Sequence, residues 1–216
     1  MRQTRSETGT AHAFYRKFGK RAFDLLLVLT TAPIWVPLAI IVAVAVRLSM
    51  GAPVMYTQAR VGRSGTPFVI RKFRTMSEAS HNDGSPLADV DRITPLGAVL
   101  RSMSLDELPQ LWQVIRGDLS IIGPRPLPIE YLSLYNDHQR RRHTVRPGIT
   151  GAAQVQGRNT LPWDKRFAAD VAYTENVSLR NDLTILAATL RTVISGAGVM
   201  ESGVSTATPF RGNTDR

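Results

Sequence analysis

Two carboxylates stand side by side at Asp106 and Glu107, upstream of a segment in which Arg125 lies between two prolines. A carboxylate can act as a nucleophile at phosphorus and divide one difficult displacement into two easier steps. An arginine can hold phosphate oxygens through paired hydrogen bonds, and neighbouring prolines restrict its backbone. These residue types in this order predict phosphate chemistry.

Two adjacent anions would repel a diphosphate, so this chemistry requires a divalent cation. Mg²⁺ held by one or two carboxylates and by the substrate's phosphates meets that need, and we expect it as cofactor. Cationic side chains must also neutralise the remaining phosphate oxygens. The candidates in restricted backbone settings are Arg74, Arg101, Arg125, Arg146 and Arg158. For any one of them alone, an exposed surface charge is the simpler interpretation.

The carboxylates also have a purely structural interpretation. Ser104 and Glu107 have the spacing of a capping box, which is the more common role of an isolated Ser-x-x-Glu. The positive end of the helix would at the same time keep Asp106 ionised and favour a bound phosphate. Capping and catalysis are therefore compatible at this position.

An apolar segment at residues 25–46 carries no charged residue and is long enough for a membrane-spanning helix. A simple transmembrane anchor is the plainest interpretation. Pro33 and Pro37 should bend the helix, because each lacks an amide hydrogen and clashes with the preceding turn. Basic residues flank the segment on both sides, which favours a re-entrant helix whose ends return to one membrane face. The segment is too long and begins too late for a cleavable secretory signal.

Composition narrows the remaining possibilities. The chain of 216 residues has a net charge of +10 and no cysteine, which excludes thiol catalysis, disulfides and cysteine zinc sites. Its four histidines have no zinc-ligand spacing. The positive charge suits nucleic acid, anionic lipid or a phosphorylated substrate. Nucleic acid is disfavoured because no recognisable nucleic-acid-binding module accompanies the basic residues.

The pattern along the chain predicts an α+β fold, a small and mostly helical catalytic domain with a short β-hairpin. We expect the hairpin at residues 54–73, helices at 93–101, 105–115 and about 129–143, and glycine-rich loops at 146–151 and 154–159. Two further apolar stripes at helical spacing begin at Trp163 and Leu183 and favour core packing, with lipid contact as the alternative. The basic triplet 140–142 would complement a helix dipole or contact lipid.

We expect four regions. These are a loose tail at 1–12, a membrane-associated re-entrant (helix-break-helix) segment at 13–50, a cytoplasmic catalytic domain at 51–200 and a weakly ordered tail at 201–216. Interfacial amphipathic helices would add to the membrane attachment.

Several ordered stretches resemble the bacterial sugar transferases, the monotopic polyprenyl-phosphate phosphoglycosyl transferases. They occupy residues 20–24, 72–76, 101–109, 117–126, 130–136, 146–151 and 154–159. Val36 departs from the pattern, because many members have serine before the proline at the helix break. The hydroxyl that could satisfy a freed carbonyl is then missing, and Pro33 or the threonines at 30 and 31 would compensate.

The resemblance implies that Asp106 attacks the β-phosphorus of a UDP-sugar and expels UMP. Polyprenyl (undecaprenyl) phosphate would then take the sugar phosphate from the covalent aspartyl intermediate. Glu107 would be the Mg²⁺ ligand, Arg101 and Arg125 would hold phosphates, and Arg158 would face the nucleotide sugar. Lys72, in one of the matching stretches, joins the substrate-binding candidates.

The resemblance also implies a location and partners. It places the catalytic domain on the cytoplasmic face of the bacterial inner membrane, among anionic lipids. An acetamido sugar is the expected donor group, and glycosyltransferases that act later in glycoconjugate assembly are expected partners. The alternative is a noncatalytic membrane-docked scaffold that binds polyanions, which explains the charge and the anchor but not the adjacent carboxylates.

Overall fold

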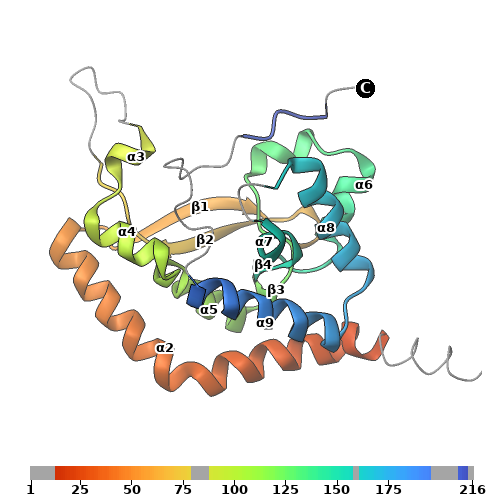
Figure 1. Cartoon of the computed structure of the whole chain (residues 1–216), viewed down its shortest axis with the longest axis horizontal. Helices are drawn as coiled ribbons and strands as arrows, with labels where there is room; N and C mark the ends of the chain where they lie inside the picture. Colours follow the sequence, from red (N-terminus) through yellow and green to blue (C-terminus); the bar gives the residue numbers. More distant parts are fainter. Residues whose placement is uncertain (1–12, 79–87, 158–160, 196–208, 214–216) are drawn as a thin grey trace, which may run out of the picture.

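The structure is a computed structural model that describes residues 13–78, 88–157, 161–195 and 209–213. A long N-terminal helix runs along one side of a unit made of two small sheets and several shorter helices (Figure 1). The expected mixture of helix and sheet, with helix predominating, is confirmed.

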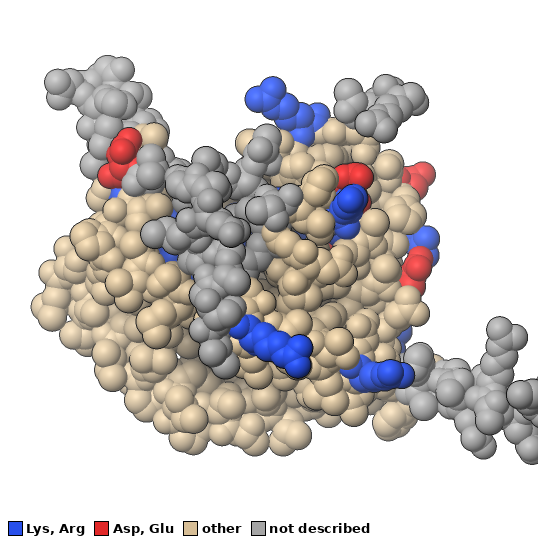
Figure 2. Space-filling model, in the orientation of Figure 1, with Lys and Arg blue, Asp and Glu red and all other residues tan. Residues whose placement is uncertain are grey.

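The N-terminal helix consists of a π-helical turn, η1 (Tyr15–Gly19), and the α-helix α2 (Lys20–Met50). It is long and apolar enough to cross a membrane, and only 11% of its apolar window is buried within the protein. Figure 1 shows that α2 changes direction near its middle, where Pro33 and Pro37 interrupt the backbone hydrogen bonds. The surface along this helix is nearly free of charged side chains (Figure 2).

Side-chain donors support the helix around this bend. The hydroxyls of Thr30 and Thr31 each donate to a carbonyl four residues earlier, at 2.7 Å. The indole Nε1 of Trp35 donates to the carbonyl of Val28 at 3.0 Å, across the bend. These donors stabilise the turn before the prolines. Residue 36, directly before Pro37, is a valine and has no hydroxyl to donate.

A buried ionic cluster fixes the start of α2 to the rest of the protein. Lys20 Nζ lies 3.0 Å from Asp24 Oδ1 and 3.2 Å from Asp182 Oδ2. Asp24 also accepts a hydrogen bond from Ser120 Oγ at 2.8 Å, and Asp182 accepts one from the Tyr173 hydroxyl at 2.8 Å. Both carboxylates are at most 1% exposed, and burial is tolerated because each is paired and hydrogen-bonded.

Two antiparallel strands, β1 (Met55–Val61) and β2 (Pro67–Phe73), confirm the predicted hairpin. In their register Gln58 pairs with Ile70, so the side chains of even-numbered residues share one face of the hairpin. This face carries Lys72 and Arg60 together, although they lie on different strands.

A second pair of strands, β3 (Ser120–Ile122) and β4 (Gly148–Thr150), is parallel. The chains approach so closely that a Cβ added to Gly148 would lie 2.1 Å from the backbone nitrogen of Gly123. Glycine is therefore required here by close backbone contact rather than by flexibility. The pairing brings the stretch at 117–126, which contains Arg125, next to the stretch at 146–151.

The other helical elements surround these sheets. They are η2 (Arg63–Gly65), α3 (Asp89–Arg92), α4 (Pro95–Ser102), η3 (Leu105–Glu107), α5 (Pro109–Arg116), η4 (Ile129–Ser133), α6 (Asp137–Arg140), η5 (Arg141–Thr144), α7 (Ala152–Gly157), α8 (Trp163–Glu175) and α9 (Leu179–Ser195).

Three sequence predictions need correction. The loop predicted at 146–151 contains the parallel strand β4. The helix predicted at 129–143 is instead three short elements, because Asn136 caps a new helix by accepting a hydrogen bond from the Gln139 amide at 2.9 Å. The loop predicted at 154–159 is helical as far as Gly157, within α7.

The core lies where α2, α5 and the parallel strands meet, and includes Val28, Val114 and Ile122, each at most 1% exposed. The apolar stripe of α8 is buried as expected at Phe167, which packs with Phe210 from the C-terminal region. The stripe of α9 is different. Leu183 and Leu190 remain 49% and 55% exposed, so part of this stripe forms an apolar surface.

Lys20→Met should lower the free energy of unfolding by about 3–5 kcal/mol, because it leaves two buried carboxylates without their cation. The matched control, Lys17→Met, removes an exposed lysine three residues earlier and should change it by less than about 0.5 kcal/mol. Denaturant unfolding of the purified protein in detergent micelles measures both values. Equal losses in the two variants would contradict the role given to Lys20.

Candidate active site

The adjacent carboxylates lie in the short turn η3, immediately before α5, and not inside a helix. The turn is entered through Ser104, which has a left-handed backbone with φ of 57°. Ser104 makes no side-chain cap, and the Glu107 side chain turns to cationic partners elsewhere, so the capping-box interpretation is wrong. A left-handed serine next to paired carboxylates is the kind of strained backbone that occurs at functional sites.

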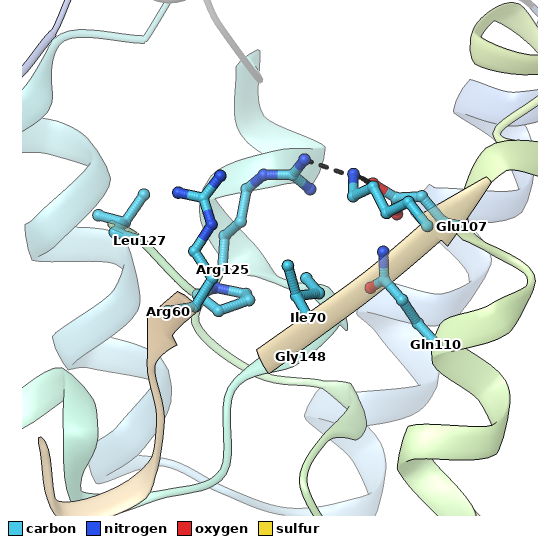
Figure 3. Close-up of a pocket in the computed structure, with 9 residues that line it drawn as sticks. Arg60, Ile70, Glu107, Gln110, Arg125, Leu127 and Gly148 are labelled. Carbon is cyan, nitrogen blue, oxygen red and sulfur yellow. Dashed lines mark hydrogen bonds and ion pairs between the residues drawn. The ribbon is translucent and has the colours of Figure 1, made fainter. Parts of the chain in front are cut away.

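Glu107 is held between two cations (Figure 3). Its Oε1 forms a short ion pair with Lys72 Nζ and lies 3.4 Å from Arg125 Nη2. Burial alone would raise the pKa of Glu107, but the charges of Lys72 and Arg125 outweigh burial and lower the pKa to about 2. Glu107 is therefore ionised throughout the neutral range.

Asp106 has the opposite tendency. It is 9% exposed, and burial followed by the negative charge of Glu107 raises its pKa above the usual value. Lys72, whose Nζ lies 4.0 Å from Asp106 Oδ2, opposes this rise together with Arg101 and Arg125. The ionisation of Asp106 thus depends on these cations, whereas the sequence had suggested the helix dipole. Two neighbouring carboxylates with pKa shifts in opposite directions suit two different tasks.

Arg101 comes from α4 and is oriented by a side chain of the preceding segment. Its Nε donates to Thr75 Oγ1 at 2.9 Å, and Thr75 is buried. Gly97 in α4 allows this contact, because an added Cβ would lie 1.9 Å from the Thr75 carbonyl oxygen. The approach of α4 to Thr75 thereby places the Arg101 charge near Asp106.

Arg125 is positioned through its backbone by Arg142, a residue that sequence reasoning did not assign to the site. Arg142 Nη2 donates to the Arg125 carbonyl at 2.7 Å and to Asp170 Oδ2 at 2.6 Å. The Arg142 and Asp170 side chains are 1% and 3% exposed. The prediction that the basic triplet serves a helix dipole or lipid is therefore wrong for Arg142. The triplet itself gave no signal of which arginine would be buried.

Two predicted phosphate ligands have other partners. Arg74 donates to the carbonyls of Met50 and Ala52 and so holds the C-terminal end of α2. Arg146 Nε donates to the Gly117 carbonyl at 2.9 Å. Within the described residues, neither arginine contacts Asp106 or Glu107. Arg158, the third, lies outside the described residues.

A small cavity opens beside Glu107 (Figure 3). Its polar lining is Arg60, Lys72, Glu107, Gln110 and Arg125. Arg60 and Gln110 were missed from the sequence. Arg60 could have been found because it shares a face of the predicted hairpin with Lys72. Gln110 could have been found because it lies about one helical turn after Glu107.

The dyad does not form a complete metal cage. Among residues 13–78, 88–157, 161–195 and 209–213, no group of three or more His, Cys, Asp or Glu side chains could enclose a metal ion. Mg²⁺ is commonly held by one or two carboxylates, with substrate phosphates and water completing its shell. Glu107 supplies one ionised carboxylate for such a shared ion, and the Mg²⁺ site stays a prediction.

Comparison with known proteins supplies the family context. The profile described as bacterial sugar transferase matches residues 15–196. The uncharacterized sugar transferase EpsL of Bacillus subtilis is 45% identical over 91% of this chain and 97% of its own length. Two relatives with specific names are each 38% identical. One is the UDP-N-acetylgalactosamine-undecaprenyl-phosphate N-acetylgalactosaminephosphotransferase of Aeromonas hydrophila, with 84% of this chain and 45% of the relative covered.

The second of these two relatives is the UDP-glucose:undecaprenyl-phosphate glucose-1-phosphate transferase of Caulobacter vibrioides. The match covers 82% of this chain and 68% of the relative. The matched region includes α2, both carboxylates and every described cation of the site.

Asp170→Asn should destabilise the protein by about 3–5 kcal/mol, because Arg142 then remains buried without its counter-ion. Glu175→Gln is the matched control on the same helix. It removes the acid that pairs with the exposed Arg141 and should cost less than about 1 kcal/mol. The free energies of unfolding in detergent test this difference, and a cost for Asp170→Asn as small as that for Glu175→Gln would refute the structural role.

Proposed function

Because the chain belongs to the bacterial sugar transferase family, we propose that it transfers a sugar 1-phosphate from a UDP-sugar to undecaprenyl phosphate and releases UMP. The observation that carries this proposal is the Asp106–Glu107 pair inside a cluster of cations, with the two carboxylates perturbed in opposite directions. The names of the specific relatives support the substrate class. A noncatalytic polyanion-binding scaffold would have no need for two carboxylates among its cations.

In the proposed first step, an oxygen of Asp106 bonds to the β-phosphorus of the UDP-sugar. The bond from that phosphorus to the oxygen bridging to UMP breaks, and UMP leaves with the electron pair. Lys72 and Arg101 stabilise the charge that develops around the phosphorus. The burial of Asp106 makes its anion less stabilised by solvent and therefore a better nucleophile.

In the proposed second step, a phosphate oxygen of the lipid acceptor attacks the same phosphorus. The bond to Asp106 breaks, and the carboxylate recovers its electron pair. The product is a polyprenyl diphosphate sugar, and the enzyme returns to its starting state without net proton transfer. Glycosyltransferases that extend this product are the partners expected to act next.

Mg²⁺ forms part of the proposal. Glu107 would hold it together with substrate phosphates, and the ion would neutralise phosphate charge as a Lewis acid. Lys72 and Arg125 keep Glu107 ionised and so preserve its capacity to act as a ligand.

We further propose that α2 is re-entrant and leaves the catalytic unit on the cytoplasmic face of the inner membrane. The bend at Pro33 and Pro37 and the basic residues beyond both ends of the apolar segment support this arrangement. The exposed leucines of α9 would lie on the lipid surface beside anionic headgroups. A phosphate acceptor on a lipid could then reach the dyad from the membrane.

Asp106→Asn should abolish both UMP release and the covalent phosphosugar adduct, because the amide is neutral and cannot replace the attacking carboxylate. A screen of UDP-sugars, beginning with acetamido sugars, with undecaprenyl phosphate identifies the donor. UMP release and intact-protein mass spectrometry then measure the two effects. Normal turnover by Asp106→Asn would sink the mechanism.

The matched control is Asp164→Asn, an exposed aspartate on α8, which should release UMP at the wild-type rate. A second experiment uses the wild-type protein in excess chelator. It should stop releasing UMP until Mg²⁺ is added back. Full activity in the chelator would remove Mg²⁺ from the proposal while leaving the role of Asp106 intact.

The rate of adduct formation falls at low pH, and in Lys72→Met this fall should occur at a higher pH than in the wild type. Asp106 must be ionised to attack, so the rate falls as the pH drops through its pKa. Lys72 lowers that pKa, and its loss raises the pKa. Single-turnover UMP release measured against pH tests the shift, with the exposed Lys165→Met as control. A fall at the same pH as in the wild type, or at a lower pH, is incompatible with this role.

A further inference from the structure

Two buried donors of the cavity have no acceptor within the described part of the chain. Arg60 donates through Nη2 to Gln58 Oε1, but its buried Nε has no partner. Gln110 is 2% exposed, and its amide nitrogen Nε2 is also without a partner. Buried donors normally have acceptors. Two such donors line one cavity, which points to a ligand that supplies the missing oxygens.

The charges of the same cavity point to an anion. The Arg60 and Arg125 guanidinium groups stand next to one another (Figure 3). Burial, followed by the positive charge of Arg125, lowers the pKa of Arg60, whereas the exposed Glu130 compensates only weakly. Arg125 pairs with Glu107 on the side of the dyad, and its other neighbour in the cavity is the cation of Arg60. Two neighbouring guanidinium groups suit the oxygens of a phosphate.

The position of Arg125 separates this region from the reacting carboxylate. Arg125 reaches toward Glu107, and Arg60 lies on its other side (Figure 3). Gln110 lies in the first turn of α5, close to the dyad, with its amide directed into the cavity. A phosphate between Arg60 and Arg125 would therefore be a neighbour of the reacting phosphorus and not that phosphorus itself.

We propose that Arg60 and Gln110, together with Arg125, form a second phosphate subsite, which holds a phosphate beside the phosphorus that Asp106 attacks. The identity of the ligand rests on the proposed function. Its chemistry is that of phosphate oxygens. They belong either to the uridine-side phosphate of the donor in the first step or to the phosphate of the lipid acceptor before it attacks in the second step. Arg60 and Gln110 are binding residues of this subsite and take no part in bond breaking.

Binding of inorganic pyrophosphate to the full chain in detergent tests the subsite without requiring turnover. Arg60→Gln should weaken binding by about tenfold or more, because a charge-assisted hydrogen-bond pair is lost. Gln110→Met, which keeps the volume and removes the donor, should weaken it several-fold. Calorimetric titration measures both, and each variant is first checked for wild-type thermal unfolding.

Arg71→Gln is the matched control, because it removes the same charge from the exposed, opposite face of the hairpin. It should bind pyrophosphate within about twofold of the wild type, since a remote exposed charge is largely screened. The subsite is refuted if Arg60→Gln and Gln110→Met bind like the wild type, or if Arg71→Gln loses as much affinity as Arg60→Gln. Arg60→Lys should recover only part of the affinity, because lysine lacks the planar fork.

The two half-reactions identify the source of the phosphate. If the donor supplies it, Arg60→Gln raises the UDP-sugar concentration that half-saturates single-turnover UMP release without lipid acceptor. If the acceptor supplies it, that step is unchanged and the KM for undecaprenyl phosphate rises instead. Unchanged concentration dependence for both substrates would overturn the assignment. Failure of the wild-type protein to release UMP would refute the proposed function alone, because pyrophosphate binding is measured separately.

Discussion

The contact of Lys20 with Asp24 and Asp182 is the interaction on which the rest of the structure depends. It joins the start of α2 to β3 through Ser120 and to α9, in a place where water has little access. Arg21, the next residue, donates to the carbonyl of Ile115 at 2.8 Å and so binds the end of α5. The helix that follows the dyad is thereby attached to the apolar N-terminal helix. The carboxylates consequently keep a defined position relative to the surface that we assign to the membrane.

The same rule of charge compensation separates structural from functional polar groups. Lys20 and Arg142 are buried with acidic partners and hold backbone segments in place. The Arg60 Nε and the Gln110 amide nitrogen are buried without acceptors, and both residues line the cavity beside the dyad. Since an unsatisfied buried donor costs free energy, its presence next to paired carboxylates is best explained by a ligand. The site thus combines cations in fixed positions with two donors that can bind a ligand's oxygens.

The apolar surfaces would give the site access to the lipid acceptor of the proposed reaction. The outward side of α2 and the leucines of α9 are exposed although they are strongly hydrophobic. Large exposed apolar surfaces are uncommon on proteins that work in water and mark contact with membranes or partners. In the proposed reaction one substrate is water-soluble and the other is anchored in the bilayer. A dyad fixed between a polar cavity and an apolar helix can meet both.

The sequence by itself determined the local elements and the chemistry of the dyad. A long uncharged apolar run identified α2, two short runs closed by glycines identified the hairpin, and apolar periodicity identified α8. The two prolines located the bend, and adjacent carboxylates near arginines indicated phosphate chemistry. Only the tertiary structure decided which cations serve the dyad. Lys72 and Glu107 are 35 residues apart in sequence and meet because the hairpin packs against η3. Arg74 and Arg146 donate hydrogen bonds to backbone carbonyls, whereas Arg60 lines the cavity and Arg142 is buried. Every arginine has the same local chemistry, and its role depends on which buried acceptors the folded chain brings within reach.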